Sequence, residues 1–335
     1  MINIKKYNEK ILHCKFFFVL VFLFILPACI KNANVSGSLG SAVTGSQGLV
    51  VGFYGNTRTI TSDKFELKLL VQNAGSYPSI SDAKPAPEGT IRIVGHDTSI
   101  IKFDNMEGAQ QIDTLPLMGK TQNSNGGQTI IPFPGTITYS NIPKGQIYSP
   151  TLQAIACYKY QTSLQAQVCI DPNPDAEGAK ACSPSEKKFS TGQGAPVSIT
   201  SITMEPSKQR TRFGITLQKT GSANDVVIRS ADDSGFEECK NGDEISSKNK
   251  DTVSLQAVLI NKQQLDCKPL LGTNPKGKSG EISLIGAKGY IECEFPINGQ
   301  KTAYSTPIQI IINYGYKTTA KTTIYIKNDA DAEVP

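Results

Sequence analysis

The sequence predicts an all-β fold, and three observations support this prediction. Apolar and polar residues alternate with a period of two in the segments 65–71 and 213–217, as they do in half-buried strands. No segment has the sustained apolar period of 3.6 that an amphipathic helix requires. Stretches rich in aromatic and β-branched residues are separated by clusters of Gly, Pro, Asn and Ser, which are typical of turns between strands.

The first 28 residues are expected to form an export signal peptide. Four lysines make the start of the chain positive, and the segment 16–26, FFFVLVFLFIL, is apolar. This apolar run has eleven residues, whereas a helix that spans a bilayer needs about 20. We therefore expect a cleaved leader rather than a membrane helix.

Residues 26–29, LPAC, follow the apolar run and resemble the lipobox of prokaryotic lipoproteins. Leu26 stands at the aliphatic position, Ala28 at the small position and Cys29 at the position that takes the lipid, while Pro27 between them is less usual. The resemblance implies an anchor on the outer face of the cytoplasmic membrane, on the outer membrane or at the cell surface. The alternative is an ordinary cleaved signal with a coincidental cysteine.

The segment 29–47 is expected to be the lipidated cysteine followed by a flexible tether, because it is rich in Ser, Gly and Asn. No later segment is apolar for 18 residues, so the lipid would be the hydrophobic anchor.

The charge balance argues against a nucleic-acid partner. The full chain has 34 basic and 29 acidic residues. Four of the lysines and Glu9 lie in the predicted leader, so an excess of two positive charges remains. Such a small excess provides no electrostatic attraction for nucleic acid.

Cysteine usage predicts disulfides. Cys14 lies in the predicted leader and Cys29 takes the lipid, which leaves six candidates: Cys157, Cys169, Cys182, Cys239, Cys267 and Cys293. An even number of cysteines in an exported chain is most simply explained by disulfides. No CxxC pair is present and His96 is the only histidine after the leader, so a zinc site is not expected.

Nine segments have the composition and length of strands. About 290 residues follow the tether, whereas one sandwich requires roughly 100, so the chain is long enough for two domains. The expected strands are 48–53, 65–71, 89–95, 135–142, 195–204, 213–217, 251–260, 280–286 and 289–295.

The second half of the chain repeats the first. The stretches 148–170 and 304–326 share eight identities in twenty-three positions without a gap. Two shorter matches occur in the same order, 71–75 with 217–221 and 135–137 with 289–291, so one domain is expected to be duplicated.

This repeat predicts two related β-sandwich domains at 48–191 and 192–328, followed by an acidic tail at 329–335. Each domain is expected to end in a hairpin made by one of the two long repeated stretches.

Two resemblances extend this prediction. The pattern Val71, Asn73, Gly75 before a turn resembles an early strand of the immunoglobulin-like modules in prokaryotic surface proteins, and the second copy keeps only the glycine, Gly221. The run 157–172, the junction GQGAPV and the terminal INYGY resemble uncharacterised envelope proteins from small-genome archaea. The first resemblance implies immunoglobulin-like sandwiches, and the second implies no particular activity.

The cysteine pairing has two candidate schemes. Cys157 and Cys169 lie six residues either side of Ser163, as facing positions of a hairpin would, and the second copy replaces both. This favours a Cys157–Cys169 bond, and the alternative is Cys169–Cys182. Because each half holds three of the six cysteines, either one bond crosses the domain junction or each half keeps a free thiol. A bond among the three cysteines of the second domain is also expected.

Four tyrosines occupy equivalent positions in the two long repeated stretches, and each pair is two residues apart: Tyr158, Tyr160, Tyr314 and Tyr316. Residues two apart point to the same face of a strand. They form either an exposed aromatic surface for a sugar or protein partner, or buried rings whose hydroxyls bond to the backbone. The second interpretation is favoured because tyrosines near the end of a sandwich strand are usually buried.

Two further segments are weak candidates for chemistry. Oxygen-bearing residues alternate in the segment 171–178, which indicates a possible calcium loop formed by Asp171, Asn173, Asp175 and Glu177. Ala176 and Cys182 stand where an EF-hand needs glycine and glutamate, so a stiff polar loop is favoured. His96 and Asp97 lack the nucleophile motif of a hydrolase, and a polar turn is favoured there.

These observations predict a lipid-anchored cell-envelope protein that is not an enzyme and needs no cofactor. Its expected role is structural, adhesive or protein-binding, through contacts between immunoglobulin-like domains and another envelope or surface protein. The first alternative is a lipoprotein that binds a carbohydrate or small ligand, although the chain has no Trp. The second alternative is a hydrolase that uses His96.

Overall fold

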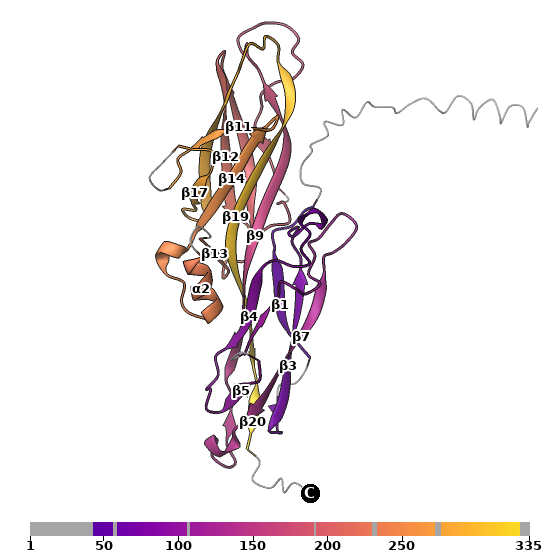
Figure 1. The fold of residues 1–335 in the computed structure, drawn as a ribbon, viewed down its shortest axis with the longest axis vertical. Helices are drawn as coiled ribbons and strands as arrows, with labels where there is room; N and C mark the ends of the chain where they lie inside the picture. Colours follow the sequence, from indigo (N-terminus) through magenta and orange to yellow (C-terminus); the bar gives the residue numbers. More distant parts are fainter. Residues whose placement is uncertain are drawn as a thin grey trace, which may run out of the picture. The chain divides into compact units, whose positions relative to one another are not determined.

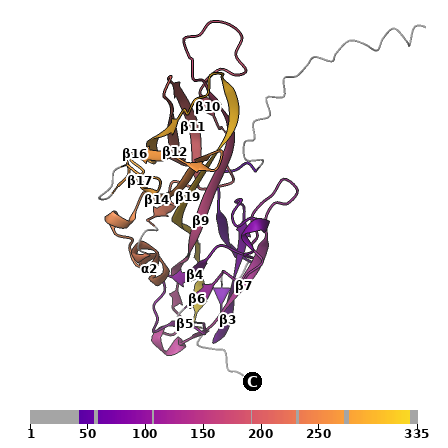
Figure 2. The ribbon, with the colours of Figure 1, turned by 45° about the horizontal axis from the view of Figure 1, so that its top comes forward.

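The described part of the protein is predominantly β. The computed structural model describes residues 43–55, 59–105, 108–190, 192–229, 233–271 and 276–328. These residues form several antiparallel sheets and one short α-helix (Figure 1 and Figure 2), so the predicted β-rich fold is confirmed. Within these ranges, no helix has the length and apolar character needed to cross a membrane. The predicted signal peptide 1–28, Cys29 and the tail 329–335 lie outside the described residues.

A four-stranded antiparallel sheet is built from the first half of the chain. Its strands, in order, are β1 (Leu49–Tyr54), β3 (Lys64–Asn73), β7 (Gln128–Ile137) and β5 (Ile101–Phe103). From Leu67 on, every second residue of β3 is buried, as the period of two predicts, and Leu69 and Val71 are fully buried.

A five-stranded antiparallel sheet is built mainly from the second half. Its strands, in order, are β10 (Lys187–Lys188), β11 (Val197–Pro206), β12 (Arg210–Lys219), β18 (Lys288–Pro296) and β16 (Asp266–Lys268). The alternating residues Phe213, Ile215 and Leu217 of β12 are fully buried.

The largest sheet draws strands from both halves. Its main path is β15 (Gln263–Gln264), β14 (Thr252–Ile260), β19 (Tyr304–Thr323), β9 (Thr151–Ile170), β4 (Gly89–Val94) and β6 (Ala109–Gln111). Two short strands are added beside this path, β13 (Val226–Ile228) against β19 and β17 (Gly280–Ser283) against β14. A residue-by-residue antiparallel pairing of β9 with β19 joins the two halves.

The remaining elements are short. A three-stranded sheet contains β2 (Thr59–Ile60), β20 (Tyr325–Lys327) and β8 (Ile147–Tyr148). The helix α2 (Ser234–Asn241) has eight residues, which is too short for its apolar period to stand out in the sequence. Among the described residues, single 3₁₀ turns lie at Ile80–Asp82, Tyr139–Asn141 and Ser247–Asn249.

The two long repeated stretches are not hairpins, so this prediction was wrong. Each forms one strand of twenty residues, β9 and β19, and the partner of each is the other repeat. Between 151 and 170 the chain has no Gly, Pro or Asn at which to turn, and apolar residues alternate through its centre. In β19, Gly315 stays extended, and the side chain of Ile228 lies 2.9 Å from the place where a Cβ would stand.

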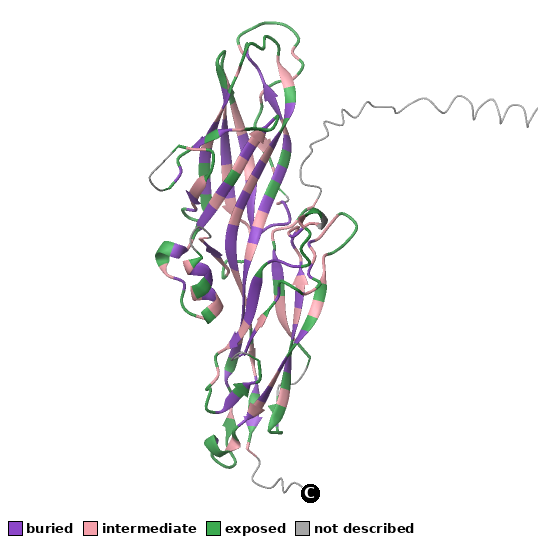
Figure 3. Cartoon of the chain, in the orientation of Figure 1, coloured by how far each residue is buried: buried purple, intermediate pink, exposed green. Residues whose placement is uncertain are grey.

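Most buried apolar residues form one large cluster that includes strands of both halves (Figure 3). The even-numbered residues of β9, and those of β19 from 306 to 316, face this core, whereas the odd-numbered residues of β9 between 159 and 167 are partly or fully exposed. Between 159 and 167 the outer surface of β9 is therefore polar.

Candidate functional site

The four repeated tyrosines lie together at the centre of the β9–β19 pair. Tyr158 is directly opposite Tyr316, and Tyr160 is directly opposite Tyr314. The rings contact one another around a closed cycle, with centroids 5.8 to 6.4 Å apart. All four side chains are at most 2% exposed, so they belong to the core and do not form an exposed aromatic surface.

The hydroxyls of two tyrosines hold the first strands of the two halves in equivalent ways. The backbone N–H of Leu49 donates to the Tyr158 hydroxyl at 2.9 Å. The backbone N–H of Val197 donates to the Tyr314 hydroxyl at 3.1 Å. Burial is the main cause that raises the pKa of both phenols.

The other two tyrosines hold the loops beside them. The Tyr160 hydroxyl donates to the carbonyl of Gly194 at 2.7 Å and accepts from the backbone N–H of Tyr77 at 3.2 Å. The Tyr316 hydroxyl donates to the carboxylate of Asp225 at 3.1 Å. Burial also raises the pKa of Tyr160 and Tyr316.

The predicted Cys157–Cys169 bond is not formed. Because β9 is one extended strand, twelve residues separate the two cysteines by roughly 40 Å. Cys157 instead bonds Cys239 of α2, and this is the bond that connects the two halves. It fixes α2 over β9, where Phe236 and Ile155 share a small apolar cluster with the disulfide.

The other two disulfides are local. Cys169 bonds Cys182, the alternative that the sequence left open. Cys267 bonds Cys293, which lies directly opposite it on the neighbouring strand, so the expected bond within the second half is present. Three disulfides indicate an extracytoplasmic protein.

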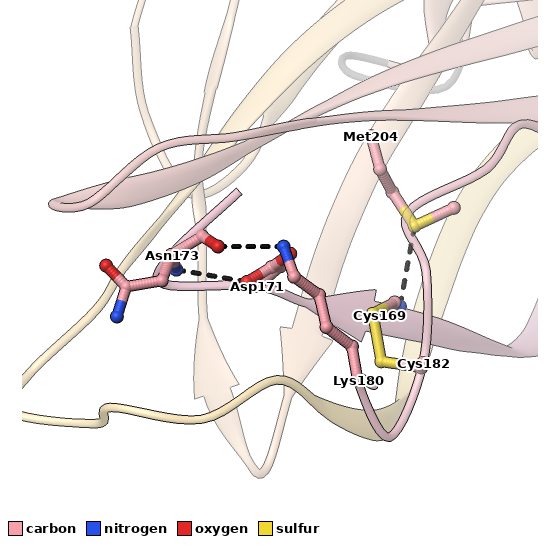
Figure 4. The surroundings of a disulfide bond; sticks show 6 residues. All are labelled: Cys169, Asp171, Asn173, Lys180, Cys182 and Met204. Carbon is pink, nitrogen blue, oxygen red and sulfur yellow. Dashed lines mark hydrogen bonds and ion pairs between the residues drawn. A yellow bond between two sulfur atoms is a disulfide. The ribbon is translucent and has the colours of Figure 1, made fainter. Parts of the chain in front are cut away.

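The candidate calcium loop holds a lysine at its centre (Figure 4). The ammonium of Lys180 lies 2.8 Å from Oδ2 of Asp171 and donates to the carbonyls of Asn173 at 2.8 Å and Pro174 at 2.9 Å. These oxygens are of the kind that calcium would use, and the lysine charge takes its place. The three donors of the Lys180 ammonium are used by Asp171, Asn173 and Pro174, so Asp175 and Glu177 take no part in this group. The described residues contain no cluster of three metal-binding side chains.

His96 lies in a turn beside a cavity of about 710 Å³. Its ring packs edge-on against Phe103 at 5.1 Å, and its Nδ1 is buried without a hydrogen-bond partner in the described structure. Burial lowers the pKa of His96, and the nearby Asp97 opposes this shift. The Asp97 carboxylate accepts from the backbone N–H of Ser99 at 2.8 Å, so it does not orient His96 as a catalytic triad requires.

A polar pocket of about 650 Å³ lies on the outer surface of the β9–β19 pair. We define it by six of its lining residues: Tyr77, Lys159, Gln161, Ser254, Glu281 and Asn313. Strands β9, β19, β14 and β17 provide five of these residues, and the loop after β3 provides Tyr77.

The centre of this pocket is a row of four polar side chains that cross four strands. Asn313 is directly opposite Gln161 on one side and Ser254 on the other, and Ser254 is opposite Glu281. Directly opposite residues project from the same face of an antiparallel sheet. Gln161 Nε2 donates to Asn313 Oδ1 at 3.0 Å.

Ion pairs fix the two ends of the polar pocket. Lys159 lies 3.0 Å from Glu88 and 3.2 Å from Asp233. Burial lowers the pKa of Lys159, but its hydrogen bonds to these two carboxylates outweigh the effect and leave the pKa raised. At the other end, Arg229 holds Glu281 through two hydrogen bonds of 2.6 and 2.7 Å.

The polar pocket is not predictable from the sequence pattern alone. The available signal was the alternation of amides with buried tyrosines, which puts Gln161 and Asn313 on the face opposite to Tyr160 and Tyr314. The pairing of β9 with β19, which brings the two amides together, is not visible in that pattern.

Comparison with known protein families finds no match to this chain, and comparison with curated proteins finds none either.

Proposed function

We propose that the chain is a lipid-anchored cell-envelope protein with a structural, adhesive or protein-binding role. The observation that carries this proposal is the continuous pairing of β9 with β19 over twenty residues. At about 3.3 Å per residue, a strand of this length spans roughly 65 Å. A paired ladder that long, with disulfides beside it, suits a rigid support that presents surfaces at a distance from its anchor.

The proposal includes two immunoglobulin-like sandwich domains, 48–191 and 192–328, that arose by duplication. The order β1, β3, β7, β5 in one sheet corresponds to the order β11, β12, β18, β16 in the other. The tyrosine contacts with Leu49 and Val197 occupy equivalent places in the two copies. Each sandwich would be completed by the long strand of the other copy, because β9 and β19 run through both.

The V-x-N-x-G segment supports the same duplication. The Asn73 amide donates to the carbonyls of Tyr77 and Leu117, both at 2.8 Å, and accepts from the N–H of Gly75 at 3.1 Å. The equivalent residue in the second copy is Lys219, whose ammonium donates to two carbonyls of the following turn. Both side chains thus hydrogen-bond the turn that follows their strand. The second copy can therefore form this turn without the asparagine.

The glycines of this segment are equivalent as well. A Cβ on Gly75 would lie 2.0 Å from the Tyr160 hydroxyl, and a Cβ on Gly221 would lie 2.0 Å from the Tyr316 hydroxyl. The glycine is retained in both copies because the tyrosine of the long strand needs this space. This pairing supports the proposed duplication, because the same contact occurs in both copies.

The mechanism in this proposal is noncovalent recognition rather than catalysis. Its anchor is the lipid on Cys29, and its partners are the membrane and another envelope or surface protein. The ion-paired side chains of the polar pocket have fixed partners, and His96 lacks an orienting carboxylate, so neither place has the arrangement of a hydrolase.

The test is cross-linking mass spectrometry on intact cells. The same digest is searched for a lipid mass on Cys29 and for proteins linked to surface lysines. Lipidated Cys29 with reproducible links to envelope or surface proteins is the expected result. An unmodified Cys29, or links to a permease in place of envelope proteins, would overturn the proposal.

A further inference from the structure

The polar pocket has the features of a binding site for an uncharged, hydroxyl-rich ligand. We propose that it binds a neutral oligosaccharide. This inference rests on the proposed envelope role, in which exposed glycans are accessible partners, and it gives that role a specific binding surface. The argument depends on the amide pair at the centre, on the charges at the two ends, and on the size of the pocket.

The amide pair leaves one acceptor and one donor directed at the pocket. Gln161 Nε2 donates to Asn313 Oδ1, which leaves Gln161 Oε1 and the Asn313 amide hydrogens without a protein partner among the described residues. If both amides were turned over, one free acceptor and one free donor would still remain. Two neighbouring hydroxyls of a sugar ring fit such a pair, because one hydroxyl donates to the carbonyl and the next accepts from the NH₂.

The ends of the pocket are charged but already neutralised. Lys159 is held between the carboxylates of Glu88 and Asp233, and Glu281 is held by Arg229. An anionic ligand would have to displace these carboxylates from Lys159, and a cationic ligand would have to displace Arg229 from Glu281. A neutral ligand can accept or donate hydrogen bonds beside these pairs without breaking them.

The shape and lining of the pocket disfavour a peptide. A volume of about 650 Å³ lies within the range of small-ligand sites, roughly 300–1,000 Å³. At Asn313 the backbone of β19 is paired on both sides, with β9 and with β14, so this strand offers no free edge for a peptide to extend the sheet. Tyr77 is the half-buried aromatic residue of the lining, and its ring offers an apolar face of the kind on which sugars stack.

The test starts with the purified full chain on an array that carries neutral hexose oligosaccharides, acidic oligosaccharides and extended peptides. The strongest neutral glycan is then titrated by calorimetry. Gln161→Ala with Asn313→Ala removes the amide pair and is expected to weaken binding by roughly 10-fold or more, because two hydrogen bonds are lost. Gln165→Ala with Gln309→Ala is the matched control, since these amides are also directly opposite each other on β9 and β19 but lie outside the pocket.

A second variant protects the test against misfolding. Ser254→Tyr fills the centre of the pocket while the Gln161–Asn313 pair remains, and it is expected to abolish binding. Thermal unfolding of each variant shows whether it is folded. Loss of binding in both pocket variants, with affinity within about 2-fold of the parent in the control pair, supports the inference.

Three results would overturn it: no neutral glycan bound, a preference for acidic glycans or peptides, or neutral-glycan binding that survives both pocket variants. The envelope role is decided separately by the intact-cell cross-links. An array without bound glycans, together with cross-links to envelope proteins, removes the glycan site and leaves the envelope role in place.

Discussion

The ammonium of Lys180 lies 2.8 Å from the carboxylate of Asp171, inside a loop that the Cys169–Cys182 disulfide closes. The Asp171 side chain is 3% exposed, so its charge depends on this lysine and on the backbone N–H of Asn173. Two of the four residues that indicated a calcium loop, Asp171 and Asn173, instead bind a cation that the chain itself provides.

Replacing Lys180 with Met is therefore expected to destabilise the protein. The buried carboxylate loses its ionic partner, which costs about 2 kcal/mol for a pair that is mostly shielded from solvent. Lys188→Met is the control, because Lys188 is 76% exposed and its pair with Glu186 contributes little. Chemical denaturation of both variants measures the difference, and equal unfolding free energies would contradict this account.

Removing the Cys157–Cys239 bond is expected to release α2 from the outer face of β9. The two cysteines are 82 residues apart in the sequence. The chain entropy that the bond removes from the unfolded state stabilises the folded protein by about 4 kcal/mol. In the Cys157→Ser, Cys239→Ser variant, hydrogen exchange should accelerate first in α2, because helix and strand are otherwise joined through a small apolar cluster.

Cys169→Ser with Cys182→Ser is the comparison for that experiment. It removes a bond between cysteines that are only 13 residues apart in the sequence, and it should leave hydrogen exchange in α2 unchanged. Unchanged α2 protection in the Cys157 and Cys239 variant would show that packing alone holds the helix.

Substitution of Gly75 by Ala is expected to cost several kcal/mol. The new Cβ would lie 2.0 Å from the Tyr160 hydroxyl and 2.6 Å from the carbonyl oxygen of Gln47, so ring or backbone must move. Gly221→Ala should have a similar cost through Tyr316. Gly52→Ala is the control, because no atom lies within 4 Å of its added Cβ. Equal melting temperatures for Gly75→Ala and Gly52→Ala would rule out the glycine–tyrosine pairing.

Alkaline pH is expected to unfold the protein through its tyrosine cycle. Burial raises the pKa of Tyr158, Tyr160, Tyr314 and Tyr316. A phenol whose pKa is raised by folding gives its full stabilisation below the unfolded pKa of about 10, and this stabilisation is lost as the pH rises above it. With four such groups, the unfolding free energy should fall by up to about 5 kcal/mol per pH unit above pH 10.

Tyrosinate absorbance and circular dichroism, followed together against pH, measure this transition. The tyrosinate signal of the buried residues should appear only as the sheet signal is lost. Tyr160→Phe removes one of the four buried ionisable phenols. It should reduce the slope of the unfolding free energy against pH by about a quarter. Full ionisation of tyrosine in a chain that keeps its sheet signal would contradict the prediction.

Local patterns predicted most of the longer strands of this protein. The segment 135–142 is an exception, because β7 ends at Ile137 and a 3₁₀ turn follows at Tyr139–Asn141. The alternation in 65–71 and 213–217 matches the buried faces of β3 and β12. This is expected because successive side chains of a strand point to opposite faces of the sheet, and only one of these faces is buried in the core. The favoured interpretation of the four tyrosines, buried rings whose hydroxyls bond to the backbone, agrees with three of them, whereas the Tyr316 hydroxyl bonds the carboxylate of Asp225. Burial of alternate residues and burial of the tyrosine rings depend on side chains that are close in the sequence and lie on the same face of one strand.

Pairing between distant segments was not predictable in the same way. The symmetric spacing of Cys157 and Cys169 around Ser163 suggested a hairpin, but spacing cannot distinguish a strand that folds back on itself from one that pairs with its repeat. The Cys157–Cys239 bond and the polar pocket both depend on the pairing of β9 with β19.

The sequence by itself determined that this chain is rich in β-strands, that its halves share a repeated pattern, and that its cysteines form disulfides. Only the tertiary structure decided that β9 and β19 pair along their full length, that Lys180 neutralises Asp171, and that Gln161 and Asn313 meet on one surface. The physical reason is that alternation and composition are properties of one segment, whereas register and partner depend on the packing of segments more than a hundred residues apart.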